Sequence, residues 1–204
     1  MPKYAGVEVD TGLPMWYAEK DGQTVVTTAY SEASNYLCGD PTPDVYGGFG
    51  TSMVLGAFDI SMQFSYSVGG LVYDSGYASL MSPPGTSTGT NIHRNMLFAW
   101  TPENKEAPIP RVQYLDENIA AQSDRFLTDA SFLNFQSAQI GYTLPRSLTE
   151  RFNVSRMRIY VLCDNIHYWS ARKGLDPRYS FTGTTNYAVN SPVRTLSGGL
   201  SITF

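Results

Sequence analysis

The sequence contains little charge and few residues of the kinds that build reactive centres. Asp, Glu, Lys and Arg make up 16% of the 204 residues, against about a quarter in an average soluble domain. The chain has two histidines and two cysteines, and its net charge is −4. Because nucleic-acid binding requires a basic patch and none is visible, a nucleic-acid partner is excluded.

Long apolar runs and a recognisable leader are lacking as well. No stretch of about 18 apolar residues occurs, which excludes helical membrane spans and leaves a β-barrel as the only way across a bilayer. Residues 1–7 do not have the charged start, the apolar stretch of about 7 to 15 residues or the cleavage site of a secretory signal. A protein that crosses a membrane as a β-barrel needs such a signal to be exported, so for a barrel we expect these 204 residues to be the end of a longer chain.

The candidates for metal binding or catalysis do not cluster. Cys38 and Cys163 are far apart in the sequence, so two free thiols are expected in preference to a disulfide, and their spacing does not indicate a metal site. Asp164 precedes His167 by three positions on an expected strand, which would place the two side chains on opposite faces and prevent a carboxylate–base pair. The other histidine, His93, falls in a long loop. We therefore expect no enzyme activity, no metal and no cofactor.

What the chain does have is alternation with a period of two. Among residues 194–204 the large apolar side chains Leu196, Leu200, Ile202 and Phe204 fall on even positions and the hydroxyl side chains on odd ones. One face of such a strand is apolar and the other polar. A strand of this kind that ends on an aromatic residue is typical of the last strand of an outer-membrane β-barrel.

Four more segments fit the same period: residues 46–55, 57–68, 132–144 and 156–165. The order of short and long connections described below adds a sixth strand that ends near Val9. Gly56 is expected to join two of them in a tight hairpin turn. Within 132–144 the apolar positions change from odd to even once, which predicts a β-bulge near Gln136 and Ser137. A strand bent between two packed layers of a soluble sandwich is the alternative for this segment.

The connections between these strands alternate in length. Gly56 and residues 145–155 are short, whereas residues 9–44, 69–130 and 170–192 are long. Outer-membrane barrels have short periplasmic turns and long external loops, so the long connections are expected outside. Six strands cannot close a barrel, because the smallest have about eight, which again indicates a piece of a larger protein.

Several phrases of the sequence, in order along the chain, resemble the SusC/RagA family of TonB-dependent outer-membrane transporters. They are residues 39–50, 57–66, 124–133, 140–145, 157–161, 164–165 with 169–170, 173–177 and 194–204, and residues 100–104 are also similar to the family. The resemblance covers most of the chain.

The resemblance implies an all-β fold: an antiparallel transmembrane β-barrel segment, about the last six strands of a 22-stranded plugged barrel. Residues 1–204 would be the C-terminal part of the barrel, with the plug domain and signal peptide absent. The parent would be a nutrient importer for glycans or peptides in the outer membrane of a Gram-negative bacterium of Bacteroidetes type. The 204 residues would not be competent for transport alone.

The implied partners are a SusD-like surface lipoprotein, the TonB complex through the missing N-terminal part, outer-membrane lipid and the barrel assembly machinery. Phe204, with Ile202 and Leu200, is expected to be the barrel-assembly signal, and it would also cover the lipid face. Expected ligand or partner contacts of the external loops are Tyr73, Tyr77, Trp100, Arg172 and Lys173.

Packing alternatives apply to these loop residues. For Trp100 a role in the core of the long loop ranks first, and the two tyrosines are undecided between that core and stacking on sugar rings. For the cations near residue 172, a solvated loop with local Asp pairing is the favoured alternative to contact with the lipoprotein or with lipopolysaccharide phosphates. A second function class for the whole chain is a soluble all-β carbohydrate-binding module.

Overall fold

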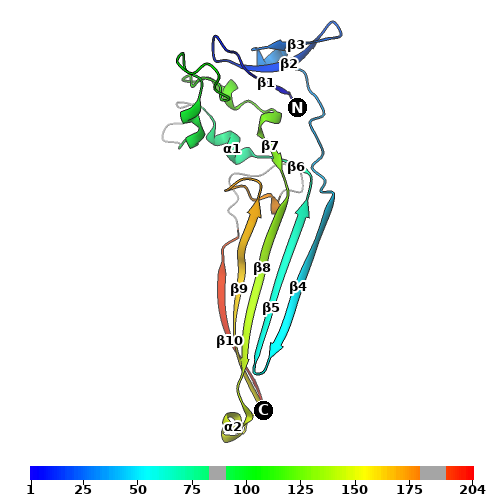
Figure 1. Ribbon diagram of the computed structural model, residues 1–204, viewed down its shortest axis with the longest axis vertical. Helices are drawn as coiled ribbons and strands as arrows, with labels where there is room; N and C mark the ends of the chain where they lie inside the picture. Colours follow the sequence, from blue (N-terminus) through cyan, green and yellow to red (C-terminus); the bar gives the residue numbers. More distant parts are fainter. Residues whose placement is uncertain (83–90, 180–191) are drawn as a thin grey trace. The chain divides into compact units, whose positions relative to one another are not determined.

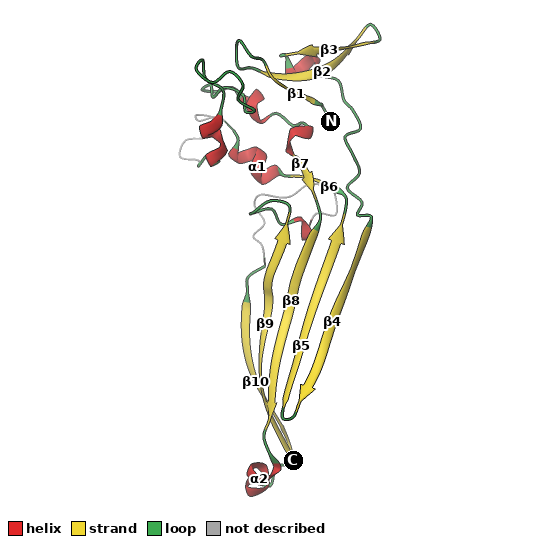
Figure 2. Cartoon of the chain, in the orientation of Figure 1, coloured by secondary structure: helices red, strands yellow, loops and turns green. Residues whose placement is uncertain are grey.

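The computed structural model describes residues 1–82, 91–179 and 192–204, and the chain divides into two units. The sheet unit comprises residues 43–70, 130–178 and 190–204, and the loop unit comprises residues 1–42, 71–129 and 179–189. Most of the described elements are antiparallel strands, as predicted (Figures 1 and 2). Each unit is described by itself below.

The sheet unit is built on one five-stranded antiparallel sheet with the strand order β10-β9-β8-β5-β4 (Figure 1). Its strands are β4 (Val45–Leu55), β5 (Phe58–Val68), β8 (Phe132–Thr143), β9 (Arg156–Ser170) and β10 (Thr195–Thr203). The alternating pattern accounts for these strands, since it gives each one an apolar and a polar side. The turn between β4 and β5 is Gly56-Ala57, where Gly56 has φ +61°.

The predicted bulge is confirmed. Ser137 of β8 pairs with Gln63 of β5, and Phe135 pairs with the next residue, Phe64, so that β8 has one extra residue at Gln136. This insertion changes the parity of β8 in the middle of the strand. Leu133 therefore points to the same side of the sheet as the even-numbered apolar residues that follow the bulge.

The number of strands in the long sheet differs from the prediction of six. The segment before Val9 does form a strand, β1 (Tyr4–Val7), but it pairs with β2 (Pro14–Lys20) in a separate sheet of the loop unit. Four residues with a glycine at φ +113° in their middle are too short and irregular to continue an 11-residue ladder.

The short connection between β8 and β9 is partly helical. It contains α2 (Arg146–Thr149) and the 3₁₀ turn η5 (Glu150–Phe152), and ends at Asn153 with φ +54°. The backbone N–H of Ser155 then donates to the carbonyl of Thr203 (2.8 Å), which joins the start of β9 to the end of β10.

The loop unit contains strands where the sequence predicted a long loop, residues 9–44. β2 and β3 (Gln23–Thr27) form a hairpin around Asp21-Gly22, and both turn residues have positive φ, +52° and +75°. That is the backbone conformation of a type I′ turn, for which Asp-Gly is a preferred sequence. Trp16 on β2 is 1% exposed and packs edge-on against Tyr30 of η1 (Tyr30–Glu32).

The other part of the loop unit has a small hydrophobic core of its own. It is formed by Tyr73, Ala78, Met81, Met96, Ala99, Ile109, Ile119 and Phe126. The elements that carry or flank these residues are β6 (Leu71–Tyr73), α1 (Ser75–Leu80), η2 (Arg94–Phe98), η3 (Glu117–Ala120), η4 (Asp124–Phe126) and β7 (Leu127–Asp129). In the described part of the chain, no helix combines the length and the apolar character that a membrane crossing requires.

Candidate functional site

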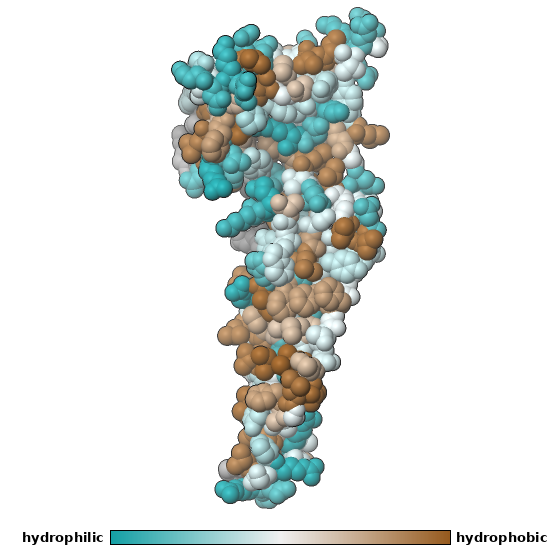
Figure 3. All heavy atoms as spheres, in the orientation of Figure 1, coloured by the Kyte–Doolittle hydropathy of each residue, from teal (hydrophilic) through white to brown (hydrophobic). Residues whose placement is uncertain are grey.

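One face of the five-stranded sheet is apolar and exposed. Ile140, on the middle strand β8, leaves 54% of its surface uncovered, and its neighbours Ile60 on β5 and Val161 on β9 extend the same row. Central positions of a sheet in a water-soluble fold would be covered by a second layer. Figure 3 shows apolar side chains gathered over the strands. Large apolar side chains on this face with substantial exposure are Val45, Phe49, Met53, Leu55, Phe58, Val68, Leu133, Ile140, Ile159, Val161, Trp169, Leu196, Leu200 and Ile202.

Aromatic rings concentrate near two levels of this apolar face. At one level Phe49, Phe64 and Phe135 stack across β4, β5 and β8, with ring centroids 4.9 Å and 4.5 Å apart. His167 on β9 pairs with Phe135 and packs edge-on against Trp169 at 4.6 Å. At the other end of β5, Phe58 lies 4.8 Å from Tyr142. The aromatic residues therefore border the aliphatic middle of the face at both ends.

The opposite face is polar and carries an ion pair that crosses a strand. The guanidinium of Arg158 on β9 binds the carboxylate of Asp59 on β5, with an Nε–Oδ1 distance of 2.9 Å, although β8 lies between the two strands. The residue of β8 beneath the pair is Gly141, and a Cβ atom there would overlap both partners. Glycine at this position therefore makes room for the ion pair.

Tyr160, also on β9, uses a second glycine in the same way. Its ring lies over Gly199 of β10, where a Cβ atom would overlap the ring, and the guanidinium carbon of Arg158 lies 5.0 Å from the ring centroid. The aromatic and charged side chains on this face of β9 therefore pack against one another.

The segment that follows β9 is anchored to the polar face by Arg178. Its guanidinium forms a double hydrogen bond with Asp176 (2.8 and 2.7 Å), donates to Oδ1 of Asn134 on β8 (2.8 Å) and lies 4.5 Å from the ring of Tyr168. The ion pair is largely buried. Local Asp pairing, which the sequence favoured for this loop, is confirmed for Arg178.

Asn134 and Tyr168 are the members of this cluster that sequence reasoning missed. The alternation of side chains along β9 could have identified Tyr168. It lies one position before Trp169 and therefore faces away from the apolar side. Of the two cations predicted to make contacts in this loop, Arg172 is half-buried and Lys173 is exposed.

Of the predicted contact residues in the loop unit, Tyr73 is buried, and Tyr77 and Trp100 are half-buried. Tyr73 is 9% exposed and packs edge-on against Phe126. The hydroxyl of Tyr77 accepts a hydrogen bond from Nδ2 of Asn95 (2.9 Å). Nε1 of Trp100 donates to the carbonyl of Val9 (3.0 Å). Trp100 is half-buried and is not among the residues of the small core, so its packing role stays a prediction.

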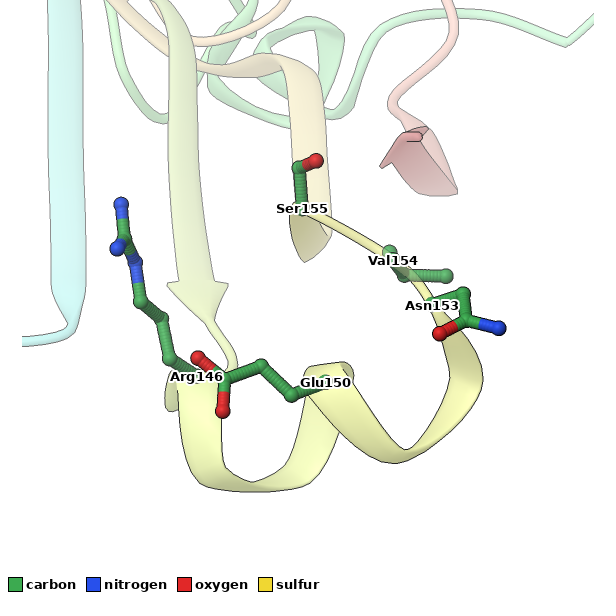
Figure 4. Close-up of a pocket in the computed structure, with 5 residues that line it drawn as sticks. All are labelled: Arg146, Glu150, Asn153, Val154 and Ser155. Carbon is green, nitrogen blue, oxygen red and sulfur yellow. The ribbon is translucent and has the colours of Figure 1, made fainter.

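The remaining candidates are separate from these groups. Asp164 pairs with Ser137 while His167 pairs with Phe135, on opposite faces of the sheet, and both cysteines are free. No group of three or more metal-ligating side chains occurs among the described residues. The turn between β8 and β9 encloses a hollow of about 340 Å³ lined by Arg146, Glu150, Asn153, Val154 and Ser155 (Figure 4).

Phe204 directly follows β10 and is 87% exposed, and Leu200 and Ile202 lie on the apolar face of β10. The two strand positions agree with the predicted assignment to one face. Their role in assembly stays a prediction.

Known proteins with this architecture are found by sequence and by structure. TonB-dependent receptor P3 of Formosa agariphila is 28% identical over 198 residues, covering 92% of this chain and 19% of the receptor. TonB-dependent receptor P26 of the same organism is 23% identical over 197 residues. The RagAB peptide importer in its open-open state superposes with a TM-score of 0.79 and 25% identity, covering all of this chain and 22% of that chain. In its closed-closed state the TM-score is 0.77.

The chain is a TonB-dependent receptor homologue. The predicted resemblance to the SusC/RagA type is thereby confirmed, although no protein-family model matches the chain. TonB-dependent receptors are outer-membrane proteins and not enzymes. This homologue spans about a fifth of the length of the relatives it matches.

Proposed function

We propose that these residues form a C-terminal portion of the barrel wall of a SusC/RagA-type importer of glycans or peptides, in the outer membrane of a Gram-negative bacterium of Bacteroidetes type. The observation that supports this most directly is the pair of unlike faces of the five-stranded sheet. The exposed apolar face would meet lipid, and the polar face with the Arg158–Asp59 ion pair would line the lumen.

The length of the strands supports the same proposal. β5 has 11 residues. At about 3.3 Å per residue and a tilt of about 40°, it would extend roughly 25 Å along the membrane normal, which matches the apolar band of outer-membrane barrels. The paired rings of Phe58 and Tyr142, at one end of β5, would then lie at one membrane interface.

The edges of the sheet support a larger barrel. β4 and β10 have a partner on one side only among the described residues. In hydrocarbon each unsatisfied backbone group costs several kcal/mol, so neighbouring strands are required at both edges. We propose a 22-stranded plugged barrel as the assembly, with the plug supplied by another part of the receptor and with no transport by these 204 residues alone.

The partners follow from this assembly. By analogy with the RagAB importer, we propose a SusD-like surface lipoprotein over the external side, together with a TonB complex acting through the plug. Arg172 and Lys173 would make external contacts with the lipoprotein or a ligand, with Tyr77 as a secondary candidate, and Tyr73 and Trp100 would shape that region by packing. Phe204, Ile202 and Leu200 would present β10 to the barrel assembly machinery.

The test compares two adjacent residues of β8 in the full-length receptor, Ala138→Arg on the apolar face and Gln139→Arg on the polar face. Ala138 pairs with Met62 near the middle of β5, and an arginine near the bilayer midplane costs about 2–4 kcal/mol on the lipid face and little on the lumen face. We expect Ala138→Arg to lower the amount of receptor in the outer-membrane fraction and Gln139→Arg to leave it near the wild-type level. Equal behaviour of the two variants, or a wild-type receptor that fractionates as a detergent-independent soluble protein, would favour the carbohydrate-binding module instead.

A further inference from the structure

Arg125 in the loop unit holds its charge in an unusual environment. Its guanidinium carbon lies 5.2 Å from the ring of Tyr4 and 5.2 Å from the ring of Phe126, and Nη1 donates to the carbonyl of Ile119 (3.0 Å). Burial is the largest influence on this group and lowers the pKa of Arg125. The cation is therefore partly removed from water and held by two aromatic faces and one backbone oxygen.

No carboxylate in the described part of the chain pairs with Arg125. Its sequence neighbour Asp124 accepts a hydrogen bond from the backbone N–H of Tyr4 (2.6 Å) and does not contact the guanidinium as an ion pair. Buried charges in proteins are normally paired, because an uncompensated one destabilises the fold. An anion beside Arg125 would supply the missing partner.

The hydroxyl group of Tyr4 is a second unused donor in the same neighbourhood. It is buried and forms no hydrogen bond with any described residue. Burial raises the pKa of Tyr4. The guanidinium of Arg125 lies over the ring that carries this hydroxyl, so both groups belong to one neighbourhood. A cation and a neutral hydroxyl donor together suit an acceptor that is negatively charged and has two oxygens.

We propose that Arg125 and Tyr4 form a recognition site for the carboxylate of a ligand, such as the C-terminal carboxylate of a peptide. The claim that this site selects cargo rests on the proposed import function: peptides carry a carboxylate and neutral glycans do not. The claim that the site binds a carboxylate concerns the loop unit alone and can be tested without transport. Arg125 supplies the charge, and the Tyr4 hydroxyl supplies direction.

Two probes that differ only in the carboxylate test the proposal on the purified full-length receptor in detergent micelles. They are N-acetyl-tetraalanine and N-acetyl-tetraalanine amide, titrated at constant ionic strength while unfolding is followed by tryptophan fluorescence. A ligand that binds the native state raises the unfolding temperature in a saturable way. We expect this shift with the free acid and not with the amide.

Variants separate recognition from packing. Arg125→Gln is expected to remove the shift, Arg125→Lys to keep a weaker one, and Tyr4→Phe to weaken the affinity about five-fold by the loss of one hydrogen bond. Arg94→Gln is the matched control, since Arg94 is an exposed arginine of the same unit, and its shift should equal that of the wild type.

Equal shifts with acid and amide, or a wild-type shift in Arg125→Gln, would overturn the proposal. If Arg125→Gln does not fold, the comparison of acid with amide in the wild type and in Tyr4→Phe still decides. The import function is tested separately by the outer-membrane fractionation of the β8 variants, so a failure of one proposal is distinguishable from a failure of the other.

Discussion

Among single residues, Tyr4 has a consequence for stability at high pH. Its pKa in the folded chain is raised above the ordinary value of 10.0, chiefly by burial. Below about pH 10 the hydroxyl is neutral in both states, and above it the unfolded state ionises first, so stability is lost as the pH rises. We expect Tyr4→Phe to reduce this loss, measured as the change in urea midpoint between about pH 8 and about pH 11.

The comparison for this prediction is Tyr114→Phe, at an exposed tyrosine of the same unit. It should lose as much stability at high pH as the wild type. A Tyr4→Phe variant that loses stability to the same extent as Tyr114→Phe would show that the Tyr4 hydroxyl does not titrate as an isolated buried group.

Residue roles were predictable from the sequence where they depend on local order. The pairing of Arg178 with an aspartate follows from two residues in one turn, and the opposite faces of Asp164 and His167 follow from strand parity. The environment of Arg125 was not predictable, because Tyr4 lies at the other end of the loop unit's sequence and only the fold brings them together.

At the scale of the element, the bulge in β8 determines which side chains lie on each face. Deletion of Gln136 would remove the extra residue and turn Leu133 and Phe135 toward the polar side. Each misplaced large apolar side chain costs about 1.5–3 kcal/mol. We expect the deletion to lower the amount of folded full-length receptor, measured by its heat-modifiable mobility in gel electrophoresis.

A substitution at the same position is the control for the deletion. Gln136→Ala keeps the number of residues and therefore the register, so its folded fraction should remain near that of the wild type. Should the deletion fold as well as Gln136→Ala, β8 would have absorbed the missing residue elsewhere and the bulge would not set the faces.

The elements that the sequence predicted are those in which apolar and polar residues alternate regularly. The long strands and the bulge follow from the alternation of apolar residues, because one face of the sheet is uniformly apolar. The hairpin of β2 and β3 was missed, although Asp21-Gly22 is a strong turn signal. Its strands alternate poorly, since β3 is exposed on both faces over most of its length, so periodicity carried no information there.

At the scale of the whole molecule, the end of β10 allows a test of assembly. Phe204 is exposed and directly follows β10, an edge strand of the sheet among the described residues. We expect deletion of Phe204 from the full-length receptor to lower its level in the outer membrane, measured by immunoblotting of membrane fractions. The control is Leu196→Ala, which shortens an internal apolar side chain of β10 and keeps the chain length. It distinguishes the loss of a terminal signal from the loss of lipid contact. Equal levels in the wild type and the Phe204 deletion would contradict the signal role.

The large-scale architecture was predicted in type and not in its count of strands. The short and long connections of the sheet alternate as expected, with Gly56-Ala57 and residues 144–155 on one side. The sixth strand was misplaced because the order of short and long connections indicates a strand before residue 9 and does not identify its partner. Pairing between distant segments is decided by the loop unit's own packing, in which β1 lies beside β2.

The ion pair over Gly141 prevents shifts in strand register that the alternation of apolar and polar residues would allow. A slip of β5 along β8 by two residues would keep every apolar side chain on its own face, so hydrophobicity alone does not forbid it. Such a slip would displace Asp59 from Arg158 by about 7 Å and leave both charges without a partner. The ion pair thus fixes the register of three strands relative to one another. In a closed barrel the sum of these register offsets is the shear number, which determines the strand tilt and the barrel radius.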